Sequence, residues 1–189
     1  AFHAYFIAVA ILMWILTAVE VNDPWVVAAW SVEAAGTMLL GFWLRDPIVR
    51  AIGTAGFGVT GLRLLGEWGS WSLWATLWVI AVVYAVSWLY RVMSASKRVD
   101  SAPWVQDSYA IAALLLLTLL LHDQVNSQWI SLAWLFEMAA LVTLGLLLRE
   151  KPFRLFAFWF AIVVLLRLLY QDLLSFQLQQ FTRIVGLFG

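Results

Sequence analysis

Two glutamates lie deep within long apolar runs of this sequence. Glu33 stands in "AWSVEAAGTMLLGFWLRDPIVR", and Glu137 stands at the same place in "AWLFEMAALVTLGLLLREKPFR". A lone carboxylate among apolar residues can bind a proton or a cation, or it can pair with a cation on a neighbouring helix. Arg63 and Arg167 lie near the end of the next apolar run in each case. We therefore expect two charge pairs, Glu33–Arg63 and Glu137–Arg167.

Two interpretations of these pairs stay open. In the structural interpretation, each pair fixes the register of two helices and satisfies both charges. In the functional interpretation, Glu33 and Glu137 bind a proton, a cation or a substrate. Because a chemical site is usually needed once whereas a packing device recurs, the repetition favours the structural interpretation.

A face of small residues on the following run adds a second candidate feature near Glu33. The 3-4-3 spacing of a helix places four residues on this face: Gly53, Gly56, Thr60 and Arg63. The residues expected opposite them on the preceding run are Trp30, Glu33, Thr37 and Gly41. Such a face either lets two membrane helices pack closely or leaves a groove for a ligand. The candidate ligand seam consists of Trp30, Thr37, Gly53, Gly56 and Thr60.

The composition indicates that lipid surrounds the elements that carry these residues. Of the 189 residues, 65% are hydrophobic and 12% are charged, whereas soluble domains have about half and about a quarter. Runs of about 20 apolar residues cross a bilayer as helices, because lipid tolerates only helices and closed barrels. We therefore predict an all-α integral membrane protein with about eight transmembrane helices. Their approximate ranges are 2–19, 25–44, 48–65, 71–93, 109–121, 129–148, 153–169 and from 173 onwards.

Several kinds of chemistry find no support in the sequence. The absence of cysteine excludes disulfides, thiolate metal sites and cysteine nucleophiles. His3 and His122 lack the spacing of metal or haem ligands. The net charge of zero gives no electrostatic case for binding nucleic acid. We therefore expect no cofactor, no metal and no catalytic residue.

An internal repeat relates the two halves of the chain. Adding 104 to a residue number pairs identical residues, including Tyr5/Tyr109, Asn22/Asn126, Trp25/Trp129, Trp30/Trp134, Gly41/Gly145, Arg45/Arg149, Arg50/Arg154 and Arg63/Arg167. Four helices separate equivalent positions, so the repeats would have the same orientation in the membrane. We predict a first four-helix unit at 1–93, a polar linker at 94–107 and a second unit at 108–189 that is truncated in its last helix. The chain is expected to be a segment of a longer protein.

The distribution of basic residues predicts the orientation. Eight of the 11 basic residues fall on one side if the helices alternate: Arg45, Arg50, Arg91, Lys97, Arg98, Arg149, Lys151 and Arg154. The positive-inside rule places this side, with the amino end and the 94–107 linker, in the cytoplasm.

The residues also resemble a known family. The pattern is A-W-x-x-E, an apolar run with Gly, then Arg, a short turn, a second Arg, and a helix ending in L-R-L-L and an acidic residue. It resembles the bacterial predicted-membrane-protein family called domain of unknown function 2339, over residues 25–68 and 129–172. The acidic end is out of register, since the first unit ends in Glu67 and the second in Gln171-Asp172. The resemblance implies tandem arrays of helices in the bacterial inner membrane, and it implies no settled activity.

Together these features predict a non-enzymatic, multi-pass membrane protein that acts as a scaffold or subunit of a larger membrane assembly. The expected partners are membrane lipids, other membrane subunits and further repeats of the same chain. The alternative is a transporter or a carrier of a lipophilic ligand that uses the Glu/Arg seam. An enzyme acting on a lipid-linked substrate is a third hypothesis.

Overall fold

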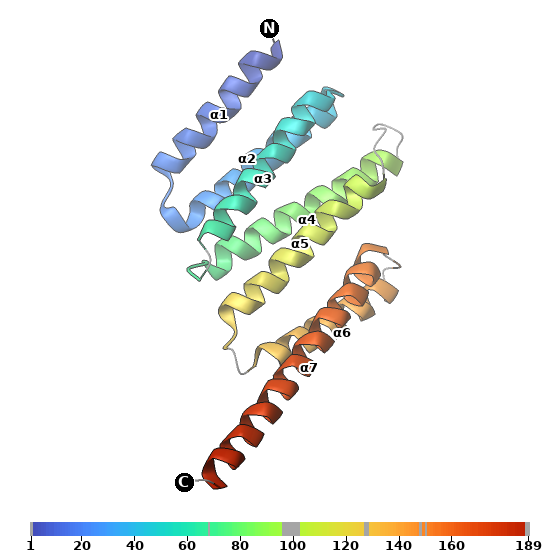
Figure 1. The fold of residues 1–189 in the computed structure, drawn as a ribbon. Coiled ribbons are helices and arrows are strands. Elements are labelled where there is room, and N and C mark those ends of the chain that lie inside the picture. Colours follow the sequence, from blue (N-terminus) through green and yellow to red (C-terminus); the bar gives the residue numbers. More distant parts are fainter. Residues whose placement is uncertain are drawn as a thin grey trace. The chain divides into compact units, whose positions relative to one another are not determined.

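The computed structural model describes residues 2–67, 69–95, 103–126, 129–147, 149 and 151–187, with side chains as far as Tyr170. These residues form seven helices and no strand (Figure 1). The helices are α1 Phe2–Glu20, α2 Asp23–Trp43, α3 Pro47–Gly66, α4 Leu73–Ala95, α5 Pro103–Gln124, α6 Ile130–Leu147 and α7 Lys151–Leu187.

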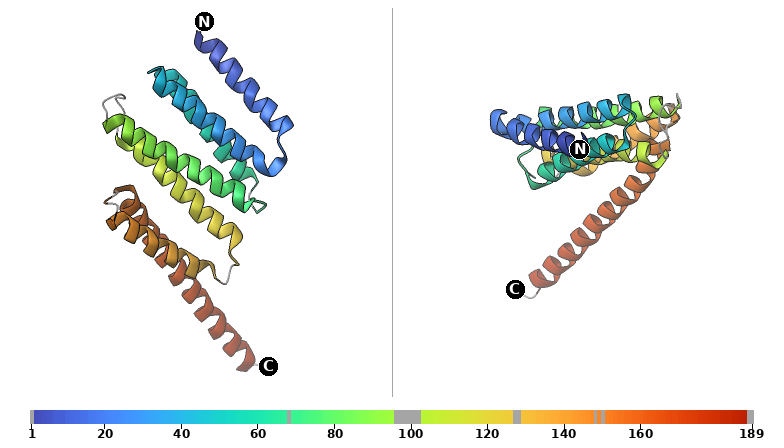
Figure 2. Two further views of the ribbon diagram at one scale, coloured as in Figure 1. Left: turned by 180° about the vertical axis from the view of Figure 1, so that it is seen from behind. Right: turned by 90° about the horizontal axis from the view of Figure 1, so that it is seen from above.

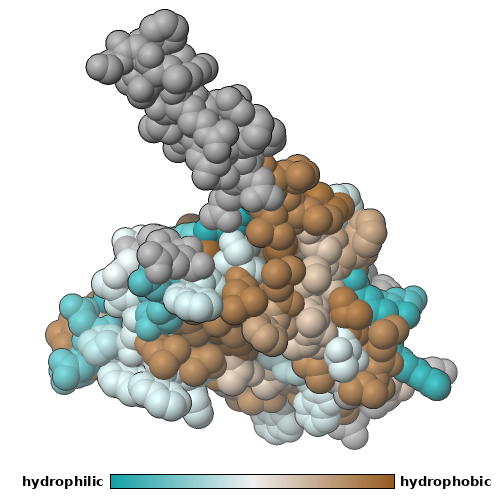
Figure 3. Space-filling view, turned by 90° about the horizontal axis from the view of Figure 1, so that it is seen from below, coloured by the Kyte–Doolittle hydropathy of each residue, from teal (hydrophilic) through white to brown (hydrophobic). Residues whose placement is uncertain are grey.

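All seven described helices are long and apolar enough to cross a membrane. Their outer surfaces carry large apolar side chains, as the space-filling view shows (Figure 3). Trp43 is 80% exposed and Leu147 is 74% exposed, and α1 buries none of its residues. Surfaces of this kind are stable in lipid and not in water. The prediction of an all-helical chain with membrane-spanning helices is therefore confirmed.

The predicted count of eight helices is not met in the described residues, because α7 continues through residue 173. At the equivalent place in the first half, α3 ends at Gly66 and Gly69 takes a φ of +87°. Only glycine adopts this backbone readily. The positions 104 residues later carry Tyr170 and Leu173, so nothing interrupts the helix. The stretch predicted as the eighth span is a continuation of α7.

The chain divides into two compact units, Ala1–Gln124 and Val125–Gly189. In the first unit α2 packs against both α3 and α4, α5 packs on α4, and α1 lies on α2 and α3 (Figures 1 and 2). In the second unit α6 and α7 form a helical hairpin. Helix α5 thus packs with the first unit, although it was predicted as the start of the second. Residues 94, 95 and 103–107 of the predicted linker are helical, and 96–102 lie outside the described residues.

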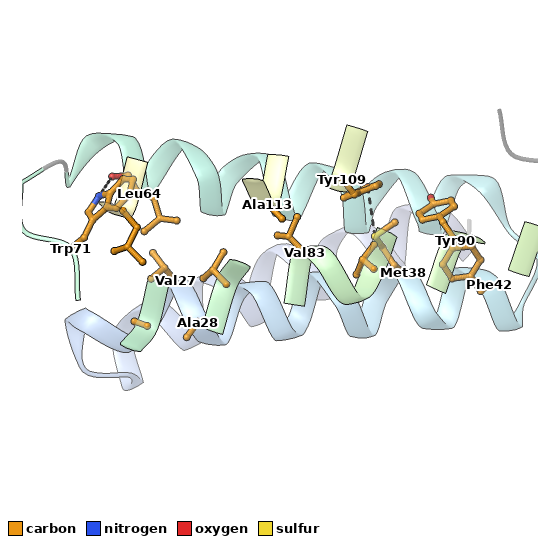
Figure 4. Close-up of a cluster of buried hydrophobic side chains, with 14 residues drawn as sticks. Val27, Ala28, Met38, Phe42, Leu64, Trp71, Val83, Tyr90, Tyr109 and Ala113 are labelled. Atoms are coloured by element: carbon orange, nitrogen blue, oxygen red, sulfur yellow. Dashed lines mark hydrogen bonds between the residues drawn. The ribbon is translucent and has the colours of Figure 1, made fainter. Parts of the chain in front are cut away.

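The core of the first unit lies where α2, α3, α4 and α5 meet (Figure 4). At one end of it the Trp71 Nε1 donates to the carbonyl oxygen of Leu64 at 2.6 Å. Toward the other end the Tyr109 hydroxyl donates to Met38 Sδ at 3.7 Å, and the Tyr109 ring stacks on Tyr90 with centroids 5.6 Å apart. The contacts of Tyr109 fix α5 against α2 and α4.

The residues Arg45, Asp46 and Pro47 form the turn between α2 and α3, and each has a separate role in it. Arg45 adopts a left-handed φ of 56°, and the Asp46 N–H donates to the Gly41 carbonyl at 2.9 Å. This is the Schellman ending of a helix, in which glycine usually holds the left-handed position. The Asp46 carboxylate then accepts from the Ile48 N–H at 2.8 Å and caps α3, with Pro47 as its first residue. One tripeptide therefore ends α2 and starts α3.

Candidate functional site

Glu33 lies on α2 and is held by α1. The Thr17 hydroxyl of α1 donates to Glu33 Oε1. Glu33 Oε2 is buried and has no hydrogen-bond partner among the described residues. The carboxylate is therefore bound to a neutral hydroxyl within the first unit.

Arg63 is bound by acidic groups near the helix ends. Its Nε donates to Glu67 Oε1 at 2.8 Å and its Nη2 to Asp23 Oδ1 at 3.0 Å. Because Arg63 lies in the last turn of α3, its long side chain reaches the polar boundary without drawing its charge toward the hydrocarbon. The ion pairs of Arg63 are thus with Asp23 and Glu67, and a Glu33–Arg63 pair stays a prediction.

The Trp30 side chain contacts both α1 and the guanidinium of Arg63. Its Nε1 donates to the Trp14 carbonyl oxygen at 2.9 Å. The Arg63 Cζ lies 5.1 Å from the centroid of the Trp30 ring, which is a cation–π distance. The polar groups of α1, α2 and α3 thus form one set of fixed helix–helix contacts.

The candidate ligand seam is filled by protein atoms. A Cβ added at Gly53 would contact Met38 Cγ and would lie 2.8 Å from the Ala34 carbonyl oxygen. A Cβ added at Gly56 would lie 2.5 Å from Cζ2 of Trp14. Thr60 is 1% exposed, and its hydroxyl donates to the Gly56 carbonyl at 2.9 Å.

Thr37 is half-buried on the same helix as Trp30. The glycines of the seam therefore allow close approach of α2 and Trp14, and a ligand groove at this face stays a prediction. Of the two alternatives for this face, helix packing is the one the structure forms.

The second unit has the same cation–π contact. Arg167 Cζ lies 4.7 Å from the centroid of the Trp134 ring, and Trp134 and Arg167 are the residues 104 positions after Trp30 and Arg63. Glu137 on α6 is 7% exposed. Ion pairs among the described residues join His3 to Asp46, Arg63 to Asp23 and Glu67, and Arg91 to Asp107. The Glu137–Arg167 pair stays a prediction.

Three further local features recur 104 residues apart. Arg149 has a φ of 54°, as Arg45 has 56°. A Cβ at Gly41 would lie 2.6 Å from Arg50 Cγ, and one at Gly145 would lie 2.8 Å from Arg154 Cγ. The Trp25 N–H donates to the Asn22 carbonyl at 2.9 Å, and the Trp129 N–H donates to the Asn126 carbonyl at 2.8 Å. The 104-residue repeat in the sequence paired these residues, but it did not predict the turn conformation and the contacts that they form.

His3 serves a structural contact that the sequence did not indicate. Its Nε2 lies 2.7 Å from Asp46 Oδ2 and so ties the start of α1 to the α2–α3 turn. This hydrogen bond lowers the pKa of Asp46, and the Ile48 and Val49 amides act in the same direction. No group of three or more metal-binding side chains occurs in the part of the chain that the structure describes.

A groove between α3 and α5 was also missed. It has a volume of about 700 Å³ and lies on a face of α3 that does not include Gly53 and Gly56. Its α3 wall includes Thr54, Gly58 and Gly61. The groove depends on which helices pack together in space, and periodicity within one helix carries no such information.

The helices and their polar contacts define a class, the helical multi-pass membrane proteins. Comparisons with protein-family models, with curated proteins and with solved structures found no match to this chain. Any narrower assignment therefore has to be argued from the residues themselves.

Proposed function

We propose that this chain is a non-enzymatic subunit or scaffold of a larger assembly in the bacterial cytoplasmic membrane. The observation that supports the proposal is that polar side chains of the helices contact neighbouring helices. Glu33, Trp30 and Arg63 are engaged in fixed contacts between α1, α2 and α3. Polar groups that bridge helices in this way stabilise helix packing, which is what a scaffold requires.

We further propose that α2–α3 and α6–α7 are two copies of one building unit. The support is the agreement in local geometry at positions 104 residues apart, which includes two arginines in a left-handed conformation. Such a conformation costs a residue with a Cβ about 1–2 kcal/mol, so its recurrence indicates common ancestry and not chance. Repeated units of this kind stack into arrays. The resemblance to domain of unknown function 2339 agrees with such an array and remains part of the proposal.

The orientation follows from the charges. The α2–α3 turn and the carboxyl end of α4 lie at the same end of the first unit (Figure 1) and carry Arg45, Arg50 and Arg91. We place this end in the cytoplasm. Because the chain has no cysteine, single cysteines report on topology without background. Arg45→Cys should be blocked only by a thiol reagent that enters the cytoplasm, and Asn22→Cys should be blocked by an impermeant one.

The transporter hypothesis loses its main support, because protein atoms fill the Gly53–Gly56 face. A direct test of the scaffold proposal is the mass of the particle that contains the chain. A tagged chain extracted with its native lipid into polymer nanodiscs should be found in particles that contain other membrane proteins or further copies. Particles that contain one copy of the chain, and bind a transported solute, would instead support the transporter.

A further inference from the structure

Helix α1 has an open apolar stripe. None of its residues is buried, whereas α2, α3, α4 and α5 all bury side chains. One face of α1 is hydrogen-bonded to α2 through Thr17 and Trp14. On another face Tyr5 is 74% exposed, Leu12 is 65% exposed and Leu16 is 52% exposed. Steps of seven and four residues place these three side chains on one stripe of the helix, the open stripe of α1.

The same stripe recurs on α5, and there it is covered. The repeat of 104 residues pairs the three residues with identical ones, Tyr109, Leu116 and Leu120. Tyr109 is 7% exposed and Leu120 is 2% exposed, and Leu116 packs against the core of the first unit. By contrast Ile11 and Leu115, which the repeat also pairs, are 48% and 49% exposed. The two helices therefore share a stripe that is buried on α5 and open on α1.

Helix α4 packs against α5 along this stripe. The Tyr90 ring stacks on Tyr109 with centroids 5.6 Å apart, and the Ser87 hydroxyl donates to the Gln106 carbonyl at 2.8 Å. The other buried side chains of α4 are alanine, threonine and valine, which are short, as is usual where membrane helices pack closely. The carboxyl end of α4 lies beside the amino end of α5, so the two helices run antiparallel (Figure 1).

We propose that the open stripe of α1 binds an antiparallel transmembrane helix of a partner subunit that has a surface of the α4 type. The proposal rests on the scaffold function and adds the chemistry of the partner. That chemistry is a row of short side chains with an aromatic ring that stacks on Tyr5, as Tyr90 stacks on Tyr109. The α4 helix of a second copy does not fit, because its own α5 already covers it. Lipid would cover any apolar stripe, but it does not account for three residues identical to those of a helix-binding stripe.

The experiment measures the binding of an α4 peptide to the purified chain. A fluorescently labelled peptide of residues Leu73–Ala95 is added in mild detergent, and fluorescence anisotropy gives its affinity. The wild type should bind the peptide, and Tyr5→Ala should bind it about two- to tenfold more weakly, which corresponds to one lost aromatic pair. Ile11→Ala should leave the affinity unchanged, because the paired Leu115 is exposed on α5. A peptide with Tyr90→Ala should bind equally to the wild type and to Tyr5→Ala.

The Tyr90→Ala peptide tests the contact without any change in the chain, and circular dichroism of the chain variants separates lost binding from lost folding. Equal affinity of the wild type and Tyr5→Ala for the unmodified peptide, or no binding by either, would overturn the proposal. Because the chain has no cysteine, a disulfide-linked dimer formed in membranes by Tyr5→Cys, and not by Ile11→Cys, would also overturn it by showing that a second copy is the occupant.

The scaffold proposal has its own test in the mass of the native particle. Particles that contain other membrane proteins, together with a failed peptide experiment, would refute the α1 interface alone. Particles that contain one copy and bind a transported solute would refute the scaffold function itself.

Discussion

Gly53 and Gly58 lie five residues apart on α3 and on different faces of it, so the effects of the same substitution at the two sites can be compared. An added Cβ at Gly53 would lie 2.8 Å from the Ala34 carbonyl oxygen and 2.9 Å from the Met38 nitrogen, whereas one at Gly58 would meet no atom within 4 Å. The nearest neighbour of the added Gly53 Cβ is Cγ of the Met38 side chain, but these other two are backbone atoms, which yield only if α2 and α3 move apart.

The magnitude follows from this difference. Both Gly→Ala changes gain the same helix propensity, about 1 kcal/mol, so that gain cancels between them. Forcing a methyl group into a packed interface costs about 1–3 kcal/mol. We therefore expect Gly53→Ala to be less stable than Gly58→Ala by about 1–3 kcal/mol. In a chain of this size that corresponds to a difference in Tm of about 2–12 °C.

The assay is unfolding in detergent, followed by circular dichroism and by the fluorescence of the tryptophans. Wild type, Gly53→Ala and Gly58→Ala should be compared at the same ratio of detergent to protein. A difference between the two variants of less than about 0.5 kcal/mol would refute the closed α2–α3 interface. It would also reopen the Gly53–Gly56 face as a ligand seam.

Two further predictions concern the turns. Arg45→Gly and Arg149→Gly should each raise the free energy of unfolding by about 1 kcal/mol, because glycine adopts the left-handed conformation without the cost of a Cβ. Denaturant unfolding measures this change. A loss of stability in both variants would show that the contacts of the arginine side chains outweigh the backbone strain. The second prediction concerns Asp46, whose pKa is lowered from 3.8 chiefly by its hydrogen bond with His3. A carboxyl group whose pKa is lower in the folded than in the unfolded protein stabilises the fold at pH values above its unfolded pKa. This stabilisation is lost as the pH falls through the lower pKa of the folded protein. The difference in Tm between wild type and Asp46→Asn should therefore be constant from pH 6 to 5 and shrink below pH 3.8; a difference independent of pH down to pH 3 would contradict the contact.

The helices could be predicted from the sequence because lipid imposes their length and the turns carry strong signals. Pro24 and Pro47 stand in the first turns of α2 and α3, where proline fixes the start of a helix. Where such signals are absent the prediction failed. The second half lacks glycine at 170 and 173, and α7 continues where a turn had been expected.

The partners of the charged residues were harder to predict than their positions. The sequence places Glu33 and Arg63 on neighbouring helices, but an arginine side chain is long enough to choose among several acceptors. The nearest polar groups at its helix end, Asp23 and Glu67, prevail. Thr17 could not be selected as the partner of Glu33 because the packing of α1 on α2 depends on the rotation of each helix. The groove was missed for the same reason.

The central claim is that Glu33 is a packing group between α1 and α2, and a double-mutant cycle tests it most directly. The free energy of unfolding should be measured for wild type, Thr17→Val, Glu33→Gln and the double variant in the same detergent. The hydrogen bond between Thr17 and Glu33 predicts a coupling energy of about 0.5–3 kcal/mol. A coupling energy near zero would contradict the claim, and it would return Glu33 to the list of candidate binding groups.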